Sequence, residues 1–182
     1  MSDRRRAISG DSLRFVVLIG ASGSGKTTIA HAIEERYRDD VRVFYFDRIG
    51  VPSGDRMVVE YGSGEAWQRA KTLEWMAKLA PLSGCGRGVL FEGQTRLSFL
   101  AEAAAAAGIA AYLPILLDCD DETRVRRLSH ERQQPALLNE NVMTWANYLR
   151  RDAKQRGCDI LDTSAIGLDE CVAYVMAQLR GP

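Results

Sequence analysis

The segment Gly20-Ala21-Ser22-Gly23-Ser24-Gly25-Lys26-Thr27 restricts the fold more than any other part of this 182-residue chain. It matches the pattern G-x-x-x-x-G-K-[ST] and stands between an apolar run over 13–20 and an amphipathic stretch over 26–37. Glycine loses more backbone entropy on folding than any other residue, so three glycines this close together need a reason. A strand, a glycine-rich turn and a helix in this order let backbone N–H groups converge on an anion. The segment therefore predicts a phosphate-binding loop.

The loop residues have separate expected tasks in holding a nucleoside triphosphate. Lys26 is expected to reach the β- and γ-phosphates, and the Thr27 hydroxyl to ligate Mg²⁺. ATP and Mg²⁺ are accordingly the expected cofactors. The alternative, an ordinary glycine turn followed by a helix cap, explains the pattern less completely. The predicted nucleotide-binding residues of the loop are Gly20, Ala21, Ser22, Gly23, Ser24, Gly25, Lys26, Thr27 and Thr28.

Composition predicts one soluble domain. Apolar content of 46% and charged content of 26% are ordinary for a globular protein, and the net charge is zero. This balance counts against broad binding to nucleic acid or to anionic membranes. The four scattered cysteines lack metal-ligand spacing, and no transmembrane run is present, so we expect a cytoplasmic protein. Residues 1–12 are polar and are expected to form a flexible tail ahead of a single domain over 13–182.

Short apolar runs alternate with amphipathic stretches along the chain. This alternation predicts an α/β fold with a parallel sheet covered on both faces. The segment 50–55, GVPSGD, has the composition of a turn. The expected strands are 13–20, 41–47, 87–93, 112–120 and 158–163, and the expected helices are 26–37, 64–80, 96–107, 123–133, 140–156 and 168–179.

Absent motifs narrow the class of phosphate-loop protein. A GTPase normally carries an N-K-x-D motif for guanine, and this sequence has none, which favours ATP. A mechanical AAA-type or helicase core is usually larger and has a strand that ends in adjacent acids. Here the strand GVLFEG ends in one acid, Glu92. A small enzyme is therefore the better expectation than a molecular motor.

The order of these parts resembles the small P-loop kinases, such as nucleoside monophosphate kinases, shikimate kinase and gluconate kinase. The resemblance covers about 13–179 and is specific only at short motifs. It implies a three-layer α/β/α P-loop kinase fold with a five-stranded parallel sheet in the order 2-3-1-4-5. It also implies an acceptor-binding insert at about 50–85 and a lid at about 124–150.

The resemblance implies roles for residues at the ends of strands two and three. Where monophosphate kinases have D-G-x-P-R, this chain has Glu92-Gly93-Gln94-Thr95-Arg96. Glu92 and Arg96 are therefore expected to face the acceptor, although a helix-capping acid and a solvated arginine are the alternatives. Asp47 is expected to bind Mg²⁺ and to orient or deprotonate the acceptor. The alternative for Asp47 is a turn-forming side chain.

The resemblance also assigns arginines to the lid. Arg124 is expected to bind the nucleotide, while Arg127 and Arg132 stabilise the phosphoryl group in transfer. Arg150 and Arg151 could form the returning side of the lid. The alternative is a helix with solvated charges paired at i,i+4 spacing. The segment 162–170 is expected beside the adenine base.

The resulting expectation is an ATP- and Mg²⁺-dependent kinase with Lys26, Asp47, Arg127 and Arg132 as catalytic residues. Its acceptor would be a small molecule that bears a hydroxyl or phosphate group. Two alternatives stay open: an ATP-binding regulatory or switch ATPase, and a kinase acting on nucleic-acid ends. The residues leave the acceptor's identity and the oligomeric state undetermined.

Overall fold

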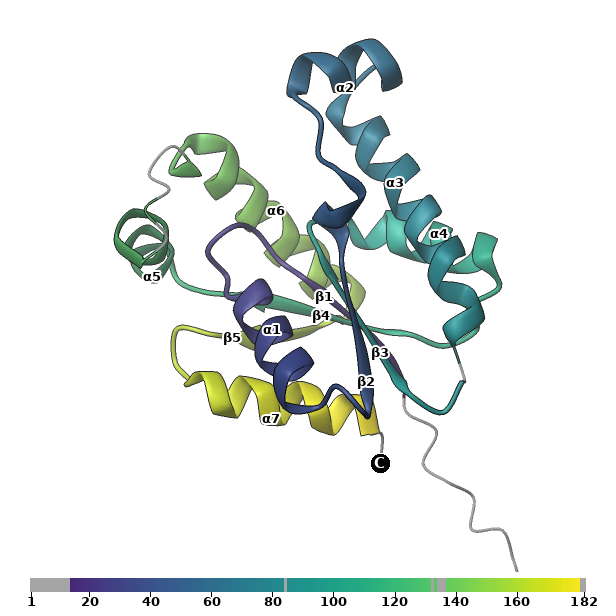
Figure 1. Cartoon of the computed structure of the whole chain (residues 1–182). Coiled ribbons are helices and arrows are strands. Elements are labelled where there is room, and N and C mark those ends of the chain that lie inside the picture. Colours follow the sequence, from purple (N-terminus) through teal and green to yellow (C-terminus); the bar gives the residue numbers. More distant parts are fainter. Residues whose placement is uncertain (1–13, 84, 132, 134–136, 181–182) are drawn as a thin grey trace, which may run out of the picture.

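A five-stranded parallel sheet forms the centre of the protein (Figure 1). The computed structural model describes residues 14–83, 85–131, 133 and 137–180. The strand order is β2-β3-β1-β4-β5, which confirms the predicted order 2-3-1-4-5. The strands are β1 (Phe15–Ile19), β2 (Val41–Tyr45), β3 (Gly88–Gly93), β4 (Leu113–Asp118) and β5 (Asp159–Asp162).

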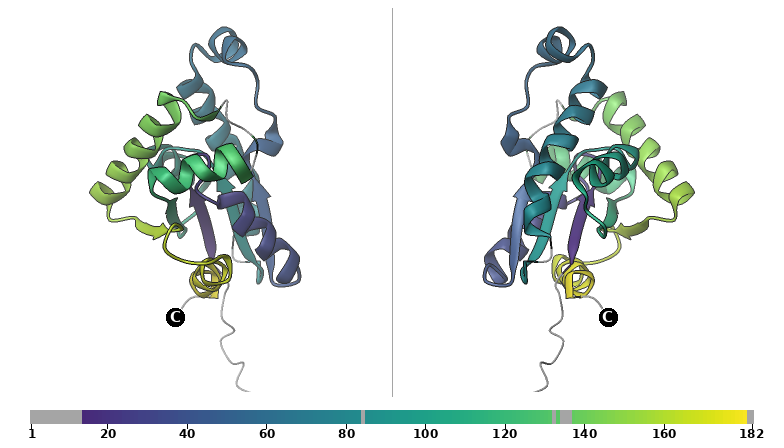
Figure 2. Two further views of the ribbon diagram at one scale, coloured as in Figure 1. Left: turned by 90° about the vertical axis from the view of Figure 1, so that its left-hand side faces the viewer. Right: turned by 90° about the vertical axis from the view of Figure 1, so that its right-hand side faces the viewer.

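Helices cover both faces of this sheet and complete the three-layer architecture (Figures 1 and 2). On one face lie α1 (Lys26–Arg36) and α7 (Leu168–Arg180); on the other lie α3 (Gly64–Leu79), α4 (Leu97–Ala107) and α6 (Glu140–Arg156). All five residues of β1 are buried, with Val16 and Leu18 packed in the first layer and Val17 and Ile19 in the second. This two-sided burial explains why β1 is a continuous apolar run.

The segment after β2 departs from the sequence-based expectation. The short 3₁₀ turn η1 (Phe46–Ile49) leads to a helix, α2 (Gly54–Tyr61), where only a turn over 50–55 was expected. Ser53 is the reason: its hydroxyl accepts a hydrogen bond from the backbone N–H of Arg56 at 3.4 Å and caps the helix. Residues typical of turns are also typical of a helix N-cap. The predicted turn over 50–55 was therefore wrong at residues 54 and 55, which begin α2.

Helix α2 projects from the body of the protein beyond the end of α3 (Figure 2). It contributes no buried residue, and Val59 on it is 85% exposed. Ser63 caps α3, whose Trp67 and Met76 are buried in the core. A turn η2 (Ala80–Leu82) follows α3. Thus α3 anchors the insert, while α2 contacts the core only through the half-buried Met57 and Tyr61.

The helix expected over 123–133 is divided in the structure. Asp120 caps α5 (Asp121–Arg126) by accepting a 2.6 Å hydrogen bond from the N–H of Thr123, and a π-helical turn, η3 (Arg127–Glu131), follows. Such turns occur often at functional sites. The predicted tail 1–12 lies outside the described residues. Among the residues that the structure does describe, no helix is long and apolar enough to cross a membrane.

Candidate active site

The predicted phosphate loop joins β1 to the N-terminus of α1. Gly23 and Gly25 have φ values of +80° and +90°, a left-handed conformation that favours glycine. Lys26 is only 6% exposed, and its Nζ donates to the carbonyl of Ala21 at 3.2 Å. The lysine therefore folds back across the loop that it follows. This geometry can hold an anion between backbone N–H groups and an ammonium group.

Glu92, at the end of β3, faces the loop. Its Oε1 accepts a hydrogen bond from the Thr27 hydroxyl at 3.4 Å, and the residue is 6% exposed. Burial raises the pKa of the Glu92 carboxyl above its usual 4.5, while nearby Lys26 opposes the shift and Asp47 adds to it. The site thus places a hydroxyl and a buried carboxylate together, both of them oxygen ligands of the kind that Mg²⁺ takes.

We expect Glu92→Gln to raise the melting temperature of the nucleotide-free protein at neutral pH. Folding raises the pKa of Glu92. The contribution of Glu92 to the stability of the wild-type protein is therefore most favourable below its unfolded pKa of 4.5, and it is lost as the pH rises through its folded pKa. The stabilisation by Glu92→Gln should therefore shrink towards pH 4, which thermal melts across pH would measure. A variant that is less stable than the wild type at pH 7 would contradict this explanation.

Asp47 lies in η1, one turn beyond the end of β2. Its side chain is exposed and accepts no hydrogen bond from the described residues, since the turn is closed by the backbone N–H of Gly50, which donates to the Asp47 carbonyl at 3.0 Å. Its negative charge acts on Glu92, so the two carboxylates lie on the same edge of the sheet. Next to it, the Arg48 guanidinium sits over the Tyr45 ring, 4.3 Å from the centroid.

Two glutamines, which sequence reasoning missed, connect the loop to the insert. Gln94 Nε2 donates to Ser22 Oγ at 3.0 Å, and Gln68 Nε2 donates to the carbonyl of Gln94 at 2.9 Å. The signal was available: Gln94 lies inside the motif that follows β3. Through these two hydrogen bonds, the glutamines connect α3 to the phosphate loop.

Arg96 binds neighbours on two sides. Its Nη2 donates to Glu65 of α3 at 2.9 Å. Its guanidinium lies 4.5 Å from the Tyr148 ring centroid and 5.2 Å from that of Trp145, both on α6. The side chain predicted to hold the acceptor thus contacts the insert and the returning helix at once.

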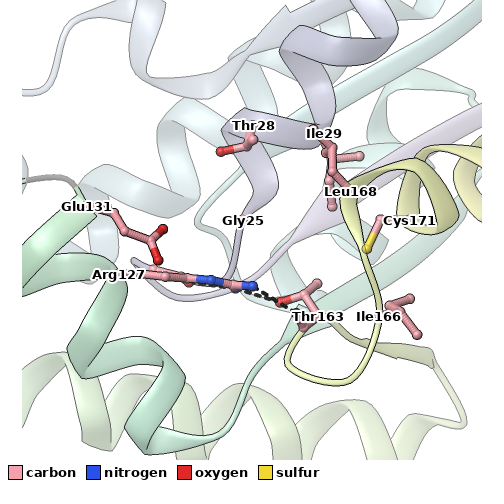
Figure 3. Close-up of a pocket in the computed structure, with 10 residues that line it drawn as sticks. Gly25, Thr28, Ile29, Arg127, Glu131, Thr163, Ile166, Leu168 and Cys171 are labelled. Atoms are coloured by element: carbon pink, nitrogen blue, oxygen red, sulfur yellow. Dashed lines mark hydrogen bonds between the residues drawn. The ribbon is translucent and has the colours of Figure 1, made fainter.

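A cavity of about 170 Å³ lies beside the loop (Figure 3). Arg127 crosses its floor: Nη1 donates to the Gly23 carbonyl at 3.2 Å and to Thr163 Oγ1 at 2.8 Å. Ile166 and Cys171 add apolar surface from the part of the chain after β5. No role was predicted for Thr163. Its hydroxyl accepts the hydrogen bond from Arg127 and lies 3.0 Å from the Ser24 carbonyl, to which it can donate.

The other predicted arginines differ in position. Arg124 is completely buried, and its Nη1 donates to the carbonyl of Ser22 at 2.7 Å, so it contacts the loop from behind. Arg132 lies outside the described residues. The structure therefore brings Lys26, Glu92 and Arg127 into hydrogen-bond contact with the loop through Ala21, Thr27 and Gly23, respectively.

A second cavity, of about 290 Å³, opens in the insert close to Asp47. Its walls come from the segment 49–52, from α2 and from α3, and they combine aromatic with charged side chains. The lining residues from α2 and α3 are Arg56, Glu60, Tyr61, Trp67 and Lys71. A small molecule could occupy it without displacing a nucleotide from the first cavity.

Comparison with known families identifies the chain. A family model described as an AAA domain matches residues 16–144, more than half of the sequence. The chain belongs to this P-loop family. Solved structures agree on the fold of this AAA-domain protein, and all three described next are under 25% identical, so they show the fold alone.

Shikimate kinase from Acinetobacter baumannii, solved with shikimate, is 15% identical with a TM-score of 0.61 over 91% of this chain and 92% of its own. APS kinase from Mycobacterium tuberculosis, solved with AMPPNP and APS, is 17% identical with a TM-score of 0.61 over 93% and 99%. An unliganded sugar kinase from Janibacter sp. HTCC2649 is 17% identical with a TM-score of 0.62 over 93% and 99%. The AAA-domain protein thus has the P-loop kinase fold that the resemblance implied.

Proposed function

We propose that the protein is an ATP- and Mg²⁺-dependent kinase that transfers the γ-phosphate of ATP to a small molecule bearing a hydroxyl or phosphate group. The observation that carries the proposal is a pair of separate cavities, one beside the phosphate loop and one in the insert, the second lined by Ile49 of the same 3₁₀ turn that carries Asp47. A switch that only hydrolyses ATP needs the loop and a water molecule. A separate cavity beside an exposed carboxylate favours a second substrate.

Three groups of residues would hold the nucleotide and its ion. The backbone N–H groups of the loop and Lys26 would bind the phosphates, and Arg127 would lie against the nucleotide. Thr27, with Asp47 or the adjacent Glu92, would hold Mg²⁺, which takes few protein oxygens and completes its shell with phosphates and water. The bound ion would supply neutralisation of the phosphate charge.

The acceptor would lie between the loop and the insert at about 50–85. Asp47 would orient its hydroxyl or accept the proton, and Glu92 and Arg96 would contribute to binding. Arg96 can serve an anionic acceptor only if it exchanges its bond to Glu65. We further propose that Arg127 and Arg132 belong to a lid at about 124–150 whose closure excludes water. The cysteines are free thiols, consistent with the proposed cytoplasmic location.

The function is tested by acceptor-dependent ADP release in the presence of ATP and Mg²⁺. Pools of nucleosides, nucleoside monophosphates, sugars, sugar acids and aminoglycosides would be compared with the background hydrolysis by water. Stimulation by one pool would support a kinase and define the acceptor class. ATP binding with equally slow hydrolysis in every pool would contradict a small-molecule kinase and favour a switch or, if binding of nucleic acid depends steeply on salt, a nucleic-acid acceptor.

Asp47→Asn should lower turnover about tenfold or more and leave the affinity for ATP nearly unchanged. An amide keeps the shape of the turn, because the bond that closes it is a backbone bond. Steady-state kinetics with the acceptor found in the screen would measure the effect. Asp55→Asn, an exposed acid in the first turn of α2, is the matched control and should behave like the wild type. A fall in stability without a kinetic effect would instead assign Asp47 to the turn.

A further inference from the structure

Arg124 is the largest completely buried side chain among the described residues, and nothing in the proposed chemistry requires a cation there. A buried guanidinium is costly unless it is paired and hydrogen-bonded. Arg124 has both kinds of partner: Nη2 donates to Asp118 Oδ1 at 3.0 Å and to the Cys119 carbonyl at 3.3 Å, while Nη1 donates to the Ser22 carbonyl. It therefore links the end of β4 to the phosphate loop.

The bond to the Ser22 carbonyl controls where the loop directs its donors. A peptide group is planar and trans, so the Ser22 C=O and the Gly23 N–H point in opposite directions. Because Arg124 holds the carbonyl oxygen behind the loop, the Gly23 N–H is directed away from Arg124. A side chain at position 23 would disturb this contact, since its Cβ would lie 3.1 Å from Arg124 Cγ.

Asp118 is shared between Arg124 and a second arginine. Arg150 of α6 donates from Nε to Asp118 Oδ2 at 2.5 Å and from Nη2 to Oδ1 at 3.3 Å. The hydrogen bond to Asp118 raises the pKa of Arg150. Arg150 is also oriented by Asn147, whose Oδ1 accepts from Nη1 at 3.0 Å. The Asp118 carboxylate thus accepts hydrogen bonds from two guanidinium groups that belong to different helices.

The sharing matters because Asp118 has two oxygens for the two arginines. With Arg150 in place, its Nε occupies Oδ2 and its Nη2 shares Oδ1 with Arg124 Nη2, which leaves Arg124 Nη1 for Ser22. Without Arg150, Asp118 can accept both Nη groups of Arg124 in the bidentate geometry that carboxylates and guanidinium groups favour. Arg124 would then release the Ser22 carbonyl.

We propose that Arg150, acting through Asp118 and Arg124, is a positioning residue for the phosphate loop and ties the placement of α6 to nucleotide affinity. The proposal rests on the nucleotide site of the proposed function but not on the identity of the acceptor. Since the proposed lid at about 124–150 includes the first part of α6, a shift of α6 that broke the Arg150 contact would weaken phosphate binding by the loop.

The test is calorimetric titration of the full chain with AMPPNP and Mg²⁺. Arg150→Met should raise the Kd about tenfold, the scale expected for one charged hydrogen bond. Lys154→Met is the matched control. Lys154, also on α6, lines a surface cavity together with Asp118 and Arg150, and its replacement removes an equal charge. Among the described residues it forms no hydrogen bond or ion pair with Asp118. The control should change the Kd less than about twofold. Melting temperatures of the free variants would report folding separately.

A double-mutant cycle then separates coupling from a general loss of charge. Asp118→Asn should also weaken binding, and adding Arg150→Met to it should change the Kd less than about twofold further. If Arg150→Met does not fold, Arg150→Lys, which keeps one donor for Asp118, should give an intermediate Kd. Unchanged affinity in a folded Arg150 variant, or equal effects of the Arg150 and Lys154 variants, would overturn the proposal. A wild-type chain that binds no AMPPNP would overturn the proposed nucleotide site itself.

Discussion

Replacing Lys26 by methionine should reduce acceptor-dependent ADP release by about 10³-fold or more. Lys26 is 6% exposed, and its ammonium group folds over the loop to the Ala21 carbonyl, where it can neutralise charge on a transferring phosphoryl group. Methionine is similar in length and fills the same space, so the melting temperature should change little. The loss should appear in the rate, measured at saturating ATP with the acceptor identified by the screen.

Lys78→Met provides the control for the Lys26 experiment. Lys78 is an exposed lysine of α3 whose Nζ donates to Glu74 at 2.7 Å, and a surface pair of this kind contributes little to stability. Its removal should leave both turnover and folding unchanged. If Lys26→Met retained more than about a tenth of wild-type turnover, the role assigned to the phosphate loop in transfer would be wrong.

The second large effect is expected for Gly23→Ala, with Gly62→Ala as its partner. Both glycines are left-handed, with φ values of +80° and +84°, so each alanine should cost about 1 kcal/mol of folding free energy. Around Gly62 nothing lies within 4 Å of a new Cβ, whereas at Gly23 the Cβ would lie 3.1 Å from Arg124 and 3.2 Å from Leu128. Only Gly23→Ala should therefore displace the loop.

The two glycine variants should differ in ligand binding. Gly23→Ala should weaken binding of AMPPNP with Mg²⁺ by at least about tenfold, because a misdirected N–H loses a charge-assisted hydrogen bond. Gly62→Ala, which lies between α2 and α3, should bind it as the wild type does. Calorimetry at a temperature where both variants are folded would compare them. Equal affinities would show that the loop tolerates a side chain at position 23.

The fold could be predicted because its signals are local. The phosphate loop is a contiguous pattern, and β1 is apolar throughout because both of its faces are buried. The expected strand order was confirmed by the sheet. Helix α2 escaped prediction because it is short and only Met57 and Tyr61 pack partly against the core, which leaves a weak apolar pattern in a segment rich in turn residues.

The site was less accessible to sequence reasoning, and Arg124 shows why. A charged residue in the stretch DDETRVRR suggests solvation, yet Arg124 is buried against the loop. The available signal was spacing: Arg124 and Leu128 are four residues apart, which places them near one face of a helix. Its partners gave no such signal, because the contact between Asp118 and Arg150 joins residues 32 positions apart in the chain.

The position of α2 outside the core has a consequence for how this protein can change over generations. Most substitutions that alter a binding surface also erode folding stability, which limits how far an enzyme can drift. Here α2 borders the cavity near Asp47 and yet buries no residue of its own. Apart from Met57 and Tyr61, which pack partly against the core, residues of this helix can therefore vary at little thermodynamic cost. Selection for a different acceptor can proceed there while the sheet and the phosphate loop stay intact.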